Sequence, residues 1–100
     1  MRPMTDVVLD GTRIRTEADL HRELADQLDL GPFYGRNLAA LRDRLEHDVE
    51  RPVRLVWRSS RESRAQLGDA LFDRVVDLLA RIADDVASRG WEERFELVLE

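Results

Sequence analysis

The sequence contains no cysteine, and it has only five glycines and three prolines among 100 residues. The absence of cysteine excludes disulfides, thiol catalysis, iron–sulfur clusters and thiolate zinc sites, and it favours a reducing cytoplasm. Hydrophobic residues make up 43% of the chain and charged residues 37%. This composition is typical of a folded domain rather than a disordered segment.

Lysine is absent as well, so all 16 basic residues are arginines, and 21 acidic residues bring the net charge to −5. On average this balance repels a nucleic-acid backbone and attracts a basic protein. The first residues lack the apolar core of a signal peptide, and no uncharged run approaches the roughly 20 residues that span a bilayer. We therefore expect a cytoplasmic protein with a cationic protein partner and no direct contact with nucleic acid or membrane.

Hydrophobic periodicity predicts strands that alternate with helices. Strands are expected at residues 6–10, 53–57 and 95–99, and helices at 17–29, at 38–46 and from 71 to just before Gly90. Strands separated by helices favour parallel pairing. The expected fold is therefore α/β, a three-stranded parallel β-sheet packed by helices in a single compact domain over residues 1–100.

Local signals mark the ends of these elements. Thr16 and Asp19 resemble a capping box, and Asn37 is a good N-cap for the second helix. After a break near Gly68, Asp69 is a candidate cap for the longest helix. Residues 58–64 form a polar stretch, a loop or the start of a helix, and Trp57 is expected in the core.

The second helix should present one charged side chain away from the core. At 100° per residue, Leu38, Leu41 and Leu45 share one side, and Asp43 lies almost opposite them. Ala39 and Glu46 fall to one side of Asp43. This surface is either a docking face or an ordinary solvated face. Of the two preceding rings, Phe33 and Tyr34, one is expected to be partly buried.

The sequence resembles the barstar family, the intracellular inhibitors of barnase-like ribonucleases. The resemblance is sharpest in Phe33-Tyr34-Gly35-Arg36-Asn37-Leu38-Ala39-Ala40-Leu41-Arg42-Asp43, and it extends to Leu9-Asp10-Gly11, Asp19-Leu20-His21 and the block from Pro52 through Trp57.

The resemblance implies inhibition by occlusion, in which the second helix and the loop before it enter the basic active-site cleft of the nuclease. Asp43 matches the central carboxylate of the family, and Asp85 falls where the family has a glutamate at the interface edge. The partner-binding residues predicted from the resemblance and the helix geometry are Phe33, Tyr34, Gly35, Asn37, Ala39, Arg42, Asp43, Glu46 and Asp85.

Several positions depart from the family pattern. Ala39 replaces an interface aspartate, Arg42 replaces a tryptophan, and Arg81 stands where a glutamate is expected. These differences predict a target other than barnase itself. The alternative is a protein-interaction or antitoxin module of the same fold whose target is not a ribonuclease.

Catalysis has little support in the sequence. His21 and His47 are the only histidines, and His21 is expected to be a structural hydrogen-bonding residue. Glu46, His47, Asp48 and Glu50 match no established metal-site spacing. We expect no enzyme activity, no metal and no cofactor, and a monomer that binds its partner one to one. The arginines at 54, 58, 61 and 64 should form a salt-bridged surface rather than a nucleic-acid site.

Overall fold

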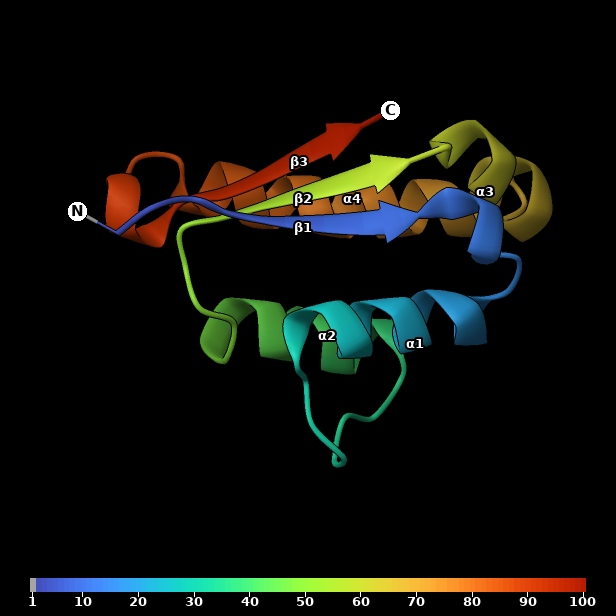
Figure 1. Cartoon of the computed structure of the whole chain (residues 1–100), viewed down its shortest axis with the longest axis horizontal. Coiled ribbons are helices and arrows are strands. Elements are labelled where there is room, and N and C mark those ends of the chain that lie inside the picture. Colours follow the sequence, from blue (N-terminus) through green and yellow to red (C-terminus); the bar gives the residue numbers. More distant parts are fainter. Residues whose placement is uncertain (1) are drawn as a thin grey trace.

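The computed structural model describes residues 2–100 and contains a small sheet with helices around it (Figure 1). The elements in chain order are β1 (Thr5–Asp10), a 3₁₀ turn η1 (Gly11–Arg13), α1 (Glu17–Leu28), α2 (Leu38–His47), β2 (Val53–Arg58), α3 (Ser60–Leu67), α4 (Asp69–Val86), a 3₁₀ turn η2 (Trp91–Glu93) and β3 (Phe95–Leu99). No helix in this part of the chain is both long enough and apolar enough to cross a membrane.

The three strands form a parallel sheet in the order β1-β2-β3, which confirms the predicted α/β fold. The register places Leu9 beside Trp57, and Trp57 beside Leu99. Along β2, Val53, Leu55 and Trp57 are buried and alternate with less buried residues, because successive strand side chains point to opposite faces of the sheet. The central strand therefore supplies the floor of the core, and Trp57 is a core residue as predicted.

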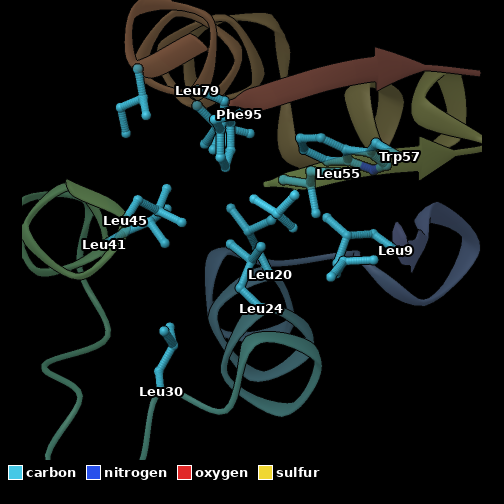
Figure 2. Close-up of a cluster of buried hydrophobic side chains, with 14 of the residues drawn as sticks. Leu9, Leu20, Leu24, Leu30, Leu41, Leu45, Leu55, Trp57, Leu79 and Phe95 are labelled. Atoms are coloured by element: carbon cyan, nitrogen blue, oxygen red, sulfur yellow. The ribbon is translucent and has the colours of Figure 1, made fainter. Parts of the chain in front are cut away.

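The helices pack around one face of this sheet. Figure 1 shows α1 and α2 below the strands, α4 behind the strands and α3 at the end where the strands finish. Side chains of α1, α2, α4 and the strands meet in one hydrophobic cluster, shown in part in Figure 2. Burying this much apolar surface is the main favourable contribution to folding. It also fixes α2 against α1 and α4.

The cap predictions were partly confirmed. The Thr16 hydroxyl accepts from the Asp19 N–H at 3.1 Å, and the Asp19 carboxylate accepts from the Thr16 N–H at 3.2 Å, which completes the capping box of α1. The prediction for Asp69 was wrong. Gly68, at a φ of +88°, occupies the cap position of α4, and the Asp69 carboxylate instead pairs with Arg64 at 3.2 Å.

The polar stretch after β2 forms the helix α3, although it carries no apolar stripe. Ser63 is fully buried, where its hydroxyl accepts from Trp57 Nε1 at 2.9 Å and donates to the Gly11 carbonyl at 2.8 Å. Ser60 donates through its N–H and its hydroxyl to the Glu100 carbonyl. These contacts with β2, η1 and the C-terminus hold a helix whose own sequence signal is weak.

Of the four arginines expected to form a salt-bridged surface, those at 54, 58 and 64 form ion pairs, whereas Arg61 forms none among residues 2–100. Arg54 pairs with Asp6 and Glu96, Arg58 with Glu100, and Arg64 with Asp69 and Asp73. Within residues 2–100, no group of three or more metal-ligating side chains comes together.

Candidate functional site: the α1–α2 loop, α2 and the facing side of α4

The connection from α1 to α2, called here the α1–α2 loop (residues 29–37), extends away from the sheet (Figure 1). It begins at Asp29, whose left-handed φ of 53° turns the chain out of α1. Leu30 then returns to the core, and its carbonyl accepts from Arg44 Nη1 at 2.9 Å (Figure 2). The base of the loop is thus attached to both helices that it connects.

Tyr34 holds the middle of the loop against α1. Its ring is 6% exposed, and its hydroxyl lies 2.6 Å from Nδ1 of His21. Nε2 of His21 lies 3.1 Å from a carboxylate oxygen of Glu17, which continues the chain of polar contacts along α1. Burial, and to a smaller extent the charge of Glu17, raise the pKa of Tyr34 to about 12. His21 therefore has the structural hydrogen-bonding role predicted for it.

Phe33 has the opposite environment from its neighbour Tyr34. Its side chain is 88% exposed at the outer part of the loop, far more than a large aromatic ring normally is. Of the two rings, one is buried and one is exposed, as expected. The structure shows which is which: Tyr34 anchors the loop, and Phe33 is presented to solvent.

The last part of the loop is shaped by close contact with α2. A Cβ atom on Gly35 would lie 3.2 Å from the Cβ of Ala40, so a residue with a side chain would require the loop or Ala40 to shift by a few tenths of an ångström. Arg36 adopts a left-handed φ of 54°, which is uncommon for a residue with a side chain. Asn37 then caps α2, because its side-chain oxygen accepts from the Ala40 N–H at 2.8 Å.

The helix α2 presents Asp43 as the sequence predicts. Leu41 and Leu45 are buried, whereas the Asp43 side chain is 70% exposed. The nearest basic group is Nε2 of His47, 3.8 Å from an Asp43 oxygen. Ala39 is exposed on the same side of the helix and leaves little side-chain bulk beside the carboxylate.

The remaining predicted residues meet in a shallow hollow of about 200 Å³ between α2 and α4, called here the α2–α4 groove. Arg42 Nε donates to Glu46 Oε1 at 2.9 Å, which lowers the pKa of Glu46 and raises that of Arg42. Asp85 of α4 lines the same groove and has a smaller electrostatic effect on Arg42. The structure therefore brings Asp85 to Arg42 and Glu46, although Asp85 is far from both in the sequence.

Some residues of this region were not predicted as site residues. Glu17 and Arg44 hold the loop, and Arg74 and Asp77 line the groove together with Arg81. The sequence of α4 contains a pattern that could have predicted its groove residues. Positions 74, 77, 81 and 85 follow helical spacing, and they form a charged row beside the buried apolar stripe.

The fold and the exposed face together define a small α/β domain that displays a tethered loop and one helix from a rigid base. The family model of Barstar (barnase inhibitor) matches residues 4–100. The chain is also 30% identical over 97 residues to the "Putative ribonuclease inhibitor YrdF" of Bacillus subtilis (strain 168), an alignment covering 97% of this chain and all of that protein. The chain belongs to the barstar family, whose members are inhibitors rather than enzymes.

Proposed function

We propose that this protein, acting as one barstar-like domain over residues 1–100, is an intracellular inhibitor of a barnase-like ribonuclease. In this proposal the α1–α2 loop and α2 enter the active-site cleft and exclude the RNA substrate. The observation that carries the proposal is the exposure of two side chains, the Phe33 ring on the tethered α1–α2 loop and the Asp43 carboxylate on α2, the helix that follows this loop. Aromatic anchors next to charged groups are typical of tight protein interfaces.

Charge supports a basic partner. The chain has a net charge of −5, and no arginine pairs with Asp43 among residues 2–100. A carboxylate without an arginine partner can bind a cation in the cleft of a ribonuclease, where a substrate phosphate would otherwise lie. Charged pairs of this kind raise the association rate and set specificity.

The proposed contact residues differ in their roles. Phe33 is the aromatic anchor, and Asp43 supplies the central charge. Tyr34 and Asn37 position the loop and the start of α2, and their contacts are mostly internal. The other proposed contact positions, which are exposed and complete the face, are Gly35, Ala39, Arg42, Glu46 and Asp85.

The proposal includes a one-to-one complex in the cytoplasm, with no metal, no cofactor and no direct contact with nucleic acid. A buried, hydrogen-bonded His21 and an exposed His47 beside two carboxylates support a binding role rather than catalysis. A general base would need a nucleophile or bound water positioned next to it. Ser63, which is fully buried and bonded to Trp57 and Gly11, does not offer one.

The test is capture followed by an RNA-cleavage assay. Immobilised wild-type protein and the Asp43→Ala variant are exposed to lysate and secreted proteins of the source cell, and each captured protein is assayed for RNA cleavage with and without added inhibitor. Truncating one partner of a buried interfacial charge pair typically costs about 2–5 kcal/mol. Asp43→Ala should therefore weaken binding at least tenfold, whereas Glu92→Ala, on η2 and outside the face, should leave it unchanged.

A second candidate is a protein-interaction or antitoxin module of the same fold with a target that is not a ribonuclease. The observation that favours it is the arginine at position 81 and the alanine at position 39, which make the face less acidic than the resemblance implies. Capture of a protein that does not cleave RNA, lost in the Asp43→Ala variant, would support this candidate over the first.

A further inference from the structure

The α2–α4 groove carries equal numbers of positive and negative side chains, in contrast to the acidic chain as a whole. Its walls are charged and its floor is apolar, formed by the partly buried Leu78 and the buried Ile82. The charged lining residues are Arg42 and Glu46 on α2, and Arg74, Asp77, Arg81 and Asp85 on α4.

Four of these six charges are already paired within the protein. Arg42 forms an ion pair with Glu46 at 2.9 Å, and Arg81 forms one with Asp77 at 2.9 Å. Arg74 and Asp85 are the two that take part in no ion pair among residues 2–100. The groove therefore has one positive and one negative side chain that form no ion pair among residues 2–100, although Asp85 also has a small electrostatic effect on Arg42.

The helix geometry separates these two charges along one side of α4. Their positions are eleven residues apart, which is about three turns of helix and a distance of roughly 16 Å. Arg74 thus marks a positive end of the groove and Asp85 a negative end, with Leu78 and Ile82 between them. A surface that covers this floor would exclude water and strengthen ionic contacts at both ends.

We infer that the α2–α4 groove binds a bipolar surface of the partner, in which a carboxylate contacts Arg74 and a cation contacts Asp85. This inference rests on the proposed function and adds the chemistry of the target beside its basic cleft. A uniformly basic surface would place a cation against Arg74, and like charges brought together at an interface cost several kcal/mol. The target therefore carries an acidic group on the rim that faces the start of α4.

The test compares one substitution at two exposed arginines, Arg74→Glu in the groove and Arg61→Glu on α3. Both positions lack an ion pair among residues 2–100, and both variants change the net charge by the same amount. The probe is the ribonuclease retained by the wild-type protein in the capture experiment. Association and dissociation rates are measured at several salt concentrations, and circular dichroism and thermal unfolding verify that each variant is folded.

Arg61→Glu should leave association unchanged or accelerate it, because added negative charge attracts a basic enzyme. Arg74→Glu should instead slow association by about three- to tenfold at low salt, with the difference shrinking as salt screens the contact. Arg74→Gln should fall between the wild type and Arg74→Glu. Exchanging the enzyme's facing carboxylate for arginine should restore binding to Arg74→Glu.

Faster association or tighter binding of Arg74→Glu would overturn the inference, and so would equal behaviour of Arg74→Glu and Arg61→Glu. In either case the ribonuclease is still captured through Asp43, so the proposed function stands. If no ribonuclease is retained, or if Asp43→Ala binds it as well as the wild type does, the proposed function fails and the inference falls with it.

Discussion

Raising the pH should release the α1–α2 loop through one group, the phenol of Tyr34. The chain has a single tyrosine, no lysine and no cysteine, and arginine stays charged to about pH 12 or above. Tyr34 is therefore the side chain expected to titrate between about pH 9 and 12. Burial and the charge of Glu17 raise its pKa from the ordinary value of 10.0 to about 12 in the folded protein.

This difference translates into a loss of stability at alkaline pH. Because the folded pKa lies above the unfolded one, the contribution of Tyr34 is complete below about pH 10 and disappears as the pH rises towards 12. A difference of one pKa unit between the folded and unfolded states corresponds to 1.36 kcal/mol. The free energy of unfolding should therefore fall by about 2–3 kcal/mol over this interval. Since small domains are typically stable by about 5–15 kcal/mol, the protein should remain folded while Tyr34 titrates.

The assay is the near-ultraviolet absorbance of tyrosinate against pH, combined with urea unfolding at each pH. Protein unfolded in urea should titrate near pH 10, and folded protein about two units higher. In Tyr34→Phe the unfolding free energy should be flat over the same interval, with a loss of about 1 kcal/mol at neutral pH from the missing bond to His21. An ordinary pKa in the folded state, or an unchanged alkaline slope in Tyr34→Phe, would refute the docking of the loop through Tyr34.

Three further substitutions test the local structure by chemical denaturation. Asn37→Ala removes the cap of α2 and should cost about 1 kcal/mol, and equal stability would mean that the cap contributes nothing. Ser63→Ala leaves the buried indole N–H of Trp57 without an acceptor and should cost about 1–3 kcal/mol, whereas a cost near zero would show that water replaces the hydroxyl. Gly11→Ala places a Cβ 2.2 Å from the Arg58 carbonyl and should cost about 3 kcal/mol, and a neutral result would contradict this close packing.

The sequence predicted those elements whose own side chains create the hydrophobic surface that they bury. α4 repeats apolar residues at helical spacing over 18 residues, and β2 alternates them with period two. The pattern of each element therefore predicts which of its sides is buried. α3 does not, because its buried residues are two serines whose partners come from other elements. Helix formation there depends on tertiary contacts that a local pattern does not record.

The site divides in the same way. The outward direction of Asp43 follows from the spacing of three leucines on one helix, so it could be predicted before the fold was known. The opposite environments of Phe33 and Tyr34 could not, since a loop has no periodicity. What separates the two rings is the position of His21 on a different element. The α2–α4 groove depends on which sides of two helices face each other, which is a property of the packed core.

This division explains how a barstar-like face can change its target without losing its shape. The residues that set the loop and helix, Leu30, Tyr34, Leu41 and Leu45, point inward and are constrained by packing. The exposed positions around Asp43 meet solvent in the free protein, and exchanging surface residues usually changes stability by less than about 0.5 kcal/mol. Alanine at position 39 and arginine at positions 42 and 81 can therefore alter the charge presented to a partner while the fold that presents it stays the same.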